Sequence, residues 1–233
     1  MSFTEAVPPQ VAQLPHLSIL EFSHTQLTGT VPSYLGLMTN LKECFFSHNE
    51  LTGTLPTELG LLTNLDSQLG FAYNSLTGTI PSELGSLSSL AGLYLDNNAL
   101  TGTIPMSIGQ MSSLRSLQLG NNTLSNSTIP SELGLLTSLQ ELGLSNTAVE
   151  GSIPAEVASL VSQNLSALSL ERNGGLTGIM PSELCELQQE SCSYELPPYF
   201  SPLDFEFSAG EESVPCHLDF DCSSSLCGCN YNC

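Results

Sequence analysis

Two histidines and several carboxylates are the residues of this chain that could carry out chemistry. His24 and His48 lie at the same position of two similar segments, SHTQL and SHNEL. The pair could bind a metal or respond to pH, but the spacing supplies no third ligand, so two solvated side chains are the simpler interpretation. Paired carboxylates in a cleft could act as general acid and base. The carboxylates of this chain come from different predicted strands, and no pocket is implied, so solvated side chains are the simpler interpretation for them as well. These carboxylates are Glu21, Glu43, Asp96, Glu141 and Glu171.

Cysteines are concentrated at the end of the chain. Seven of the eight follow residue 184, a density typical of a disulfide-linked module in an oxidising compartment. Zinc bound together with His217 is the alternative, but the spacing favours disulfides. We expect Cys185 to pair with Cys192 and four of the last five cysteines to pair internally, which leaves an odd thiol that could join a partner chain. The remaining cysteine, Cys44, occupies a core leucine site and is expected to be a small buried hydrophobe. The last five are Cys216, Cys222, Cys227, Cys229 and Cys233.

The composition excludes several classes of function. The chain has 23 acidic and 3 basic residues and a formal net charge of −20, so nucleic acid and anionic membrane surfaces are not expected as partners. No apolar run reaches the roughly 18–20 residues that span a bilayer. No nucleophile elbow, phosphate-binding loop, zinc-protease or kinase motif occurs. We therefore expect neither an enzyme nor a cofactor or metal site.

Three N-x-S/T sequons could carry glycans if the chain enters a secretory route, and chance is an equal alternative in so polar a sequence. They are Asn121, Asn126 and Asn164. The first residues, MSFTEAVPPQ, contain no secretory signal. Because the cysteines and sequons favour an extracellular or cell-surface location, we expect the chain to be a fragment of a longer protein that carries the signal.

The elements that position these residues are copies of one unit. Hydrophobic-proline dipeptides recur from Val7-Pro8 to Met180-Pro181 at intervals of 24, 24, 25, 24, 25, 24 and 27 residues. The clearest copy is LTGTIPSELGSLSSLAGLYLDNN, residues 76–98. A regular period of this length indicates one supersecondary unit that is stacked many times.

Each unit predicts a strand, a buried polar residue and a short helical turn. The alternation in Leu93-Tyr94-Leu95 indicates a half-buried strand. A buried amide after the strand can bond the backbone of its own and the adjacent coil. Proline then ends the extended segment, and the few residues that follow suit a 3-10 turn better than an α-helix. The ladder positions are Thr25, Asn49, Asn74, Asn98, Asn122, Thr147 and Asn173.

The L-T-G-x-I-P segment in a unit of this length resembles the plant-type extracellular leucine-rich repeat family. The resemblance covers residues 7–184. It implies an α/β fold, a right-handed solenoid or horseshoe with a parallel sheet on its concave side and 3-10 turns on its convex side. The family includes receptor-like kinase ectodomains, receptor-like proteins and polygalacturonase-inhibiting proteins, which bind proteins, peptides or glycans on the concave sheet or its flank. The half unit at the start lacks the family's N-terminal cap.

Two parts are expected along the chain. Residues 1–184 are predicted to form the solenoid, with about seven repeats and an N-terminal half repeat. Residues 185–233 are predicted to form a C-terminal cap and an acidic, cysteine-rich module.

Alignment of the units places outward-facing side chains in rows across the concave sheet. Aromatic side chains gather in the first four strands, and exposed rings flanked by polar groups commonly anchor interfaces or stack on sugars. Simple covering of the sheet is the alternative. We predict that the ligand-binding residues are Glu21, His24, Glu43, Phe45, His48, Tyr73, Tyr94, Asp96 and Gln118.

The predicted function is non-catalytic recognition of a protein, peptide or cell-wall glycan outside the cell. A fragment of a receptor-kinase ectodomain that acts in signalling is one alternative. An acidic matrix or adhesion protein that binds calcium or mineral through its charge is another.

Overall fold

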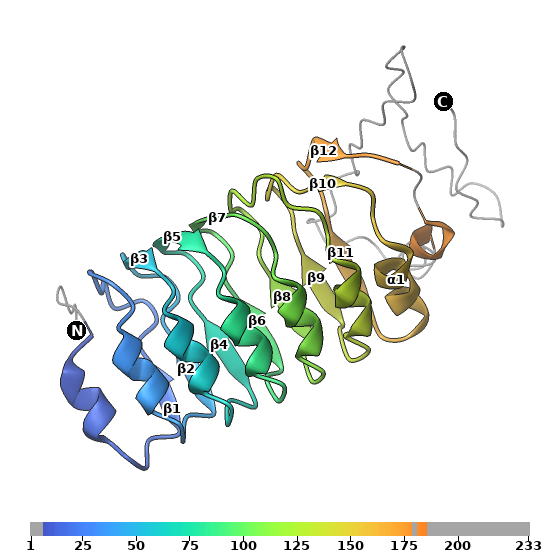
Figure 1. Cartoon of the computed structure of the whole chain (residues 1–233). Coiled ribbons are helices and arrows are strands. Elements are labelled where there is room, and N and C mark those ends of the chain that lie inside the picture. Colours follow the sequence, from blue (N-terminus) through green and yellow to red (C-terminus); the bar gives the residue numbers. More distant parts are fainter. Residues whose placement is uncertain (1–6, 179–180, 186–233) are drawn as a thin grey trace, which may run out of the picture.

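The computed structural model describes residues 7–178 and 181–185 of the chain. These residues form an elongated solenoid in which each repeat makes one coil (Figure 1). Strands lie side by side on one face of the solenoid, and short helices line the other. The predicted solenoid is therefore confirmed. The cysteines after Cys185 lie outside the described residues, and the domain boundary at residue 184 and the pairing of Cys185 stay predictions.

A seven-stranded parallel sheet in the order β1-β2-β4-β6-β8-β9-β11 forms the concave face of the described residues. Chain order and spatial order agree, as stacked coils require. Leu69 lies opposite Leu93, and Leu93 lies opposite Leu117, so the predicted rows are confirmed. The strands are β1 (Ile19–Glu21), β2 (Glu43–Phe45), β4 (Gln68–Gly70), β6 (Gly92–Tyr94), β8 (Ser116–Gln118), β9 (Glu141–Gly143) and β11 (Ala167–Ser169).

The convex side carries mainly 3-10 helices, as predicted. Most begin directly after a proline in extended conformation, such as Pro81 with φ −64° and ψ 132°. A Cβ atom on Gly85 would collide with the carbonyl oxygen of Ser107 in the next coil, so glycine permits the close packing of neighbouring helices. The helices are η1 (Pro9–Gln13), η2 (Ser33–Leu37), η3 (Thr57–Leu61), η4 (Ser82–Ser86), η5 (Met106–Gln110), η6 (Ser131–Leu135), α1 (Ala155–Ala158), η7 (Ser159–Ser162) and η8 (Ser182–Cys185).

A second set of parallel strands lies between the sheet and the helices, and the sequence reasoning did not predict it. The L-T-G-T segments form a three-stranded sheet, and two later segments form a pair (Figure 1). Gly78 adopts a φ of 75°, which glycine tolerates, while the threonines on either side stay extended. The strands are β3 (Thr52–Thr54), β5 (Ser75–Thr79), β7 (Ala99–Thr101), β10 (Glu150–Gly151) and β12 (Gly175–Leu176).

The interior is a continuous column of leucines with three stacked phenylalanines near its start. The Phe22 and Phe46 ring centroids lie 5.5 Å apart, and those of Phe46 and Phe71 lie 5.4 Å apart. Cys44 is a free, fully buried thiol in this core, which confirms its predicted place. Burial, together with the nearby charge of Glu21, raises the pKa of the Cys44 thiol to about 12. The thiol therefore stays protonated and acts as a packing group.

The predicted ladder of polar side chains is confirmed, with Asn122, Thr147 and Asn173 buried and the other members partly buried. Asn98 shows how the ladder works. Asn98 Oδ1 accepts a hydrogen bond of 3.0 Å from the backbone N–H of Leu76, one coil earlier. Its Nδ2 donates to the carbonyl oxygens of Phe71 and Leu95 at 2.9 and 3.1 Å. Each ladder amide therefore bonds the backbone of two coils. No buried side-chain nitrogen or oxygen of the described residues lacks a partner.

Replacement of Asn98 by alanine is expected to lower the free energy of unfolding by about 3 kcal/mol, because one buried backbone donor and two acceptors lose this partner. Denaturant unfolding followed by circular dichroism measures the loss. Asn64→Ala is the matched control: Asn64 is exposed and donates one bond of 2.7 Å to Thr39, so about 1 kcal/mol or less is expected. Equal losses in the two variants would contradict the role of the ladder.

Candidate ligand-binding face

A shallow hollow of about 510 Å³ lies on the sheet side, and we call it the concave hollow. Seven of the nine predicted ligand-binding residues line it. Glu21 and Glu43 do not line it, although they lie on the adjacent strands β1 and β2, and Glu21 Oε1 accepts a bond of 2.7 Å from the backbone N–H of Ser23. The seven are His24, Phe45, His48, Tyr73, Tyr94, Asp96 and Gln118.

Glycines determine how two aromatic rings lie in the concave hollow. A Cβ atom added to Gly70 would come within 3.1 Å of the Phe45 ring, and one added to Gly92 would come within 2.7 Å of the Tyr94 ring. The two rings therefore lie close over backbone that carries no side chain. This arrangement leaves ring surface of Phe45 and Tyr94 partly exposed to the hollow.

Three further rings stack along the edge of the concave hollow. The centroids of His24 and His48 lie 4.2 Å apart with an interplanar angle of 12°, and those of His48 and Tyr73 lie 4.2 Å apart at 11°. All three residues have a positive φ, between 56° and 58°. The predicted neighbourhood of the two histidines is confirmed. Because parallel stacked rings do not aim their nitrogens at one point, the pair is poorly arranged to share a metal.

Amide side chains continue the same column beyond the rings. Asn146 Nδ2 donates to Asn121 Oδ1 at 2.9 Å, and Asn121 Nδ2 donates to Asn97 Oδ1 at 3.1 Å. Asn97 Nδ2 then donates to Asp96 Oδ2 at 2.6 Å. The chain of amides thus ends on a carboxylate, and each bond polarises the next.

Asp96 is the partly buried carboxylate of the concave hollow. Burial raises its pKa, and this effect is opposed by the hydrogen bonds from Asn97 and from its own backbone and by the charge of His48. A raised carboxyl pKa means that the charged form is disfavoured in the folded chain, so stability falls as pH rises through the titration range.

Four polar residues that line the concave hollow were not in the predicted ligand-binding set: Ser23, Ser47, Gln68 and Glu141. Glu141 Oε2 accepts bonds of 3.0 Å from Ser116 Oγ and 3.4 Å from Gln118 Nε2. Gln68 and Glu141 belong to the same row of the sheet as Glu43. That row was available from the repeat alignment, so the signal was present in the sequence.

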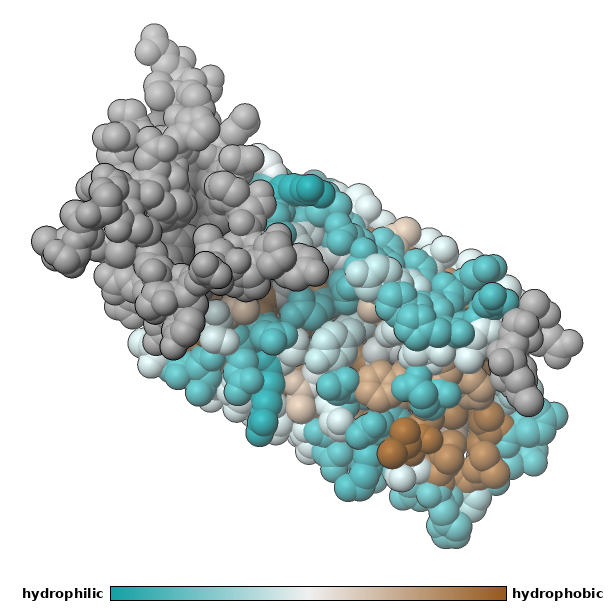
Figure 2. Space-filling view, turned by 180° about the vertical axis from the view of Figure 1, so that it is seen from behind, coloured by the Kyte–Doolittle hydropathy of each residue, from teal (hydrophilic) through white to brown (hydrophobic). Residues whose placement is uncertain are grey.

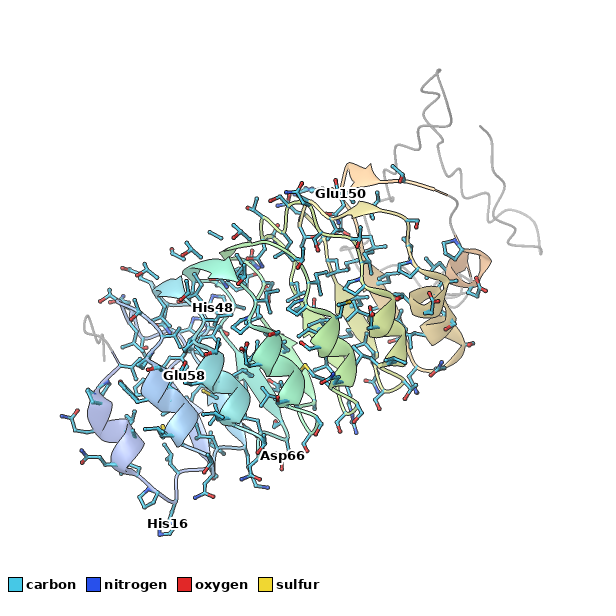
Figure 3. The ribbon with its side chains drawn as sticks, viewed as in Figure 1. His16, His48, Glu58, Asp66 and Glu150 are labelled. Atoms are coloured by element: carbon cyan, nitrogen blue, oxygen red, sulfur yellow. The ribbon has the colours of Figure 1, made fainter. Side chains whose placement is uncertain are left out.

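Figures 2 and 3 show how the faces differ. Figure 2, seen from the side of the sheet, shows apolar residues gathered over the first coils and hydrophilic residues over much of the remaining surface. Figure 3 shows Glu58 on the row of short helices and His48 beyond them, on the side of the sheet. A ligand on the sheet side would therefore not contact the helices.

The predicted glycan acceptors lie apart from one another. Asn121 is exposed but belongs to the amide chain beside a second hollow of about 420 Å³. Asn126 is exposed, with a φ of 58°, and Asn164 Nδ2 donates to the carbonyl of Thr137 at 2.8 Å. Glycosylation at these positions stays a prediction. The described residues contain no cluster of three or more potential metal ligands.

Comparison with known proteins identifies the repeat. The leucine rich repeat family model matches residues 40–62 and 89–111. A plant peptide hormone receptor, RGFR1 in complex with RGF2, is 35% identical with a TM-score of 0.74, over 78% of this chain and 28% of its own. The repeats of this chain are therefore leucine-rich repeats, and they are similar to those of plant receptor ectodomains.

Two further leucine-rich repeat structures extend the comparison. The Arabidopsis receptor kinase HAESA ectodomain, in complex with an IDA peptide hormone, is 36% identical with a TM-score of 0.73, over 79% of this chain and 31% of its own. A plant ice-binding protein is 25% identical with a TM-score of 0.60, over 87% of this chain and 66% of its own. The chain thus spans about three-tenths of the two receptor ectodomains. No curated protein sequence matches it.

The described helices are all short. None has the length and apolar character that a membrane-spanning helix needs.

Proposed function

We propose that this leucine-rich repeat chain is a non-catalytic, extracellular recognition module and that its concave hollow binds a peptide. The observation that carries the proposal is the gathering of ring surfaces from Phe45, Tyr73 and Tyr94 in one polar-rimmed hollow. Exposed aromatic rings with polar neighbours are frequent anchors of protein interfaces. The likeness to two ectodomains solved with peptide hormones supports the same ligand class.

The shape of the concave hollow also favours a peptide over a large folded partner. It is a shallow depression on a row of parallel strands, and an extended segment can lie across such strands. The whole protein in which this module works would then be a receptor or a secreted binder. Carboxylates spread along the solenoid, without a cluster of metal ligands among the described residues, give less support to calcium or mineral binding.

Phe45→Ala and Tyr94→Ala are each expected to weaken peptide binding about tenfold or more, because each removes a ring that a ligand would cover. The ligand is selected from a displayed library of random peptides on the unaltered chain, and affinity is measured by interferometry. Met106→Ala is the control, since Met106 is 65% exposed on the convex helix η5. Unchanged binding by both ring variants, with their folds intact, would contradict the proposal.

Binding of ice is a second candidate function, favoured by the threonines of the second set of strands. Thr54 lies opposite Thr77, and Thr79 lies opposite Thr101, with all four side chains exposed. Hydroxyl and methyl groups thus repeat about 4.8 Å apart between strands and about 6.7 Å apart along them. A regular and uncharged array of this kind suits the surface of a crystal. The plant ice-binding protein that shares the repeat architecture supports the candidate.

The double variant Thr54→Lys/Thr79→Lys is expected to abolish most inhibition of ice recrystallisation in frozen sucrose, because two bulky charges interrupt the array. Ser86→Lys, at an exposed position of η4 on the convex side, is expected to keep the activity. Absence of inhibition by the unaltered chain, or equal inhibition by the double variant, would contradict this candidate.

A further inference from the structure

Asp96 offers a carboxylate that is partly shielded from water and held in place. Asn97 is the one described side chain that donates a hydrogen bond to it, through Oδ2 at 2.6 Å. An ionised carboxylate has room for about four donors, so Asp96 can accept further bonds from a ligand. The amide chain that ends on Asp96 holds its orientation without neutralising its charge.

Two tyrosines line the concave hollow together with this carboxylate. Tyr94 lies two residues before Asp96, with its ring over Gly92. The Tyr73 backbone N–H donates to the Asp96 carbonyl at 3.0 Å, which places Tyr73 on the neighbouring coil, and its side chain is 49% exposed. The hollow therefore offers aromatic groups from two neighbouring coils as well as the carboxylate, and ring faces attract cations.

The charge balance of the concave hollow points the same way. Its lining contains two carboxylates, Asp96 and Glu141, two histidines, and no lysine or arginine. Lys42, which lies just before strand β2, pairs instead with Asp66 at 2.9 Å. The whole chain carries 23 acidic against 3 basic residues, so its field draws cations toward every face and repels anions.

We infer that the concave hollow recognises a cationic peptide, with an arginine or lysine side chain bonded to Asp96 and packed against Tyr94 and Tyr73. This inference rests on the proposed peptide-binding function and specifies its ligand class. Neutral sugars could stack on the same rings but would gain little from the charge of Asp96. Acidic wall oligosaccharides would be repelled by it.

The test measures binding of fluorescent tetraarginine amide to the full 233-residue chain by anisotropy at physiological salt. Asp96→Asn is expected to weaken binding about tenfold, the value of a lost charge-assisted hydrogen bond. Tyr94→Ala is expected to weaken it about fivefold through the lost cation–π contact. Glu58→Gln is the matched control, because it removes one negative charge from the convex helix η3 and should change binding less than twofold. Thermal melts check that each variant is folded.

The outcomes separate this inference from the function on which it rests. Equal weakening by Asp96→Asn and Glu58→Gln would show diffuse attraction to an acidic protein and overturn the inference. The displayed library could instead return peptides that lack lysine and arginine but still need Tyr94 for binding. That result would overturn the inference of a cationic ligand and support the proposed peptide binding. Failure of both tetraarginine and the library to bind in a Tyr94-dependent manner would overturn both proposals.

Discussion

The hydrogen bonds of the buried asparagine ladder are the constraint on which the rest of this structure depends. Each coil turns sharply at the end of its strand, and a turn of this kind leaves backbone groups without partners in an apolar interior. An amide that accepts from one coil and donates to two carbonyls satisfies these groups and joins neighbouring coils, as Asn98 does between Leu76, Phe71 and Leu95. The leucine core supplies the burial, but the ladder fixes the register.

The fixed register determines what the surface can do. With the strands aligned residue by residue, side chains that are separated by about 24 residues in sequence become neighbours on the concave face, such as Phe45, Gly70 and Tyr94. A glycine beside an aromatic residue then creates a place where a ring can lie over the sheet. The repeat therefore provides a rigid frame, and its variable positions hold the rings and the carboxylate of the concave hollow.

Much of this architecture could be predicted from the sequence because each repeat carries the same arrangement of apolar, polar, glycine and proline residues, so each copy supports the same structural prediction. The rows of the sheet, the ladder, the 3-10 turns and the adjacency of His24 and His48 all follow from the period and its alternation. The second set of strands could not be predicted in this way, since Thr-Gly-Thr followed by proline indicates a turn in isolation. It pairs only because the neighbouring coil presents the same segment.

The concave hollow was predicted in part, and the reasons for the misses are physical. Side-chain rows indicated seven of its residues, and the row of Gln68 and Glu141 was also visible in the repeat alignment, but a row alone does not say which of its members reach the hollow. The left-handed backbone at His48 and Tyr73 recurs at the same repeat position on Asn97, Asn121 and Asn146, but the bonds between these amides depend on side-chain orientations that the repeat pattern does not specify.

Hydrogen–deuterium exchange of the full chain, with and without a peptide selected on it, tests the central claim most directly. If the concave hollow is the binding site, bound peptide should slow exchange in segments 45–48, 70–73 and 94–97, and leave the convex helices unchanged. Protection confined to the helices η2 to η6, or to the threonine strands β3, β5 and β7, would contradict the account.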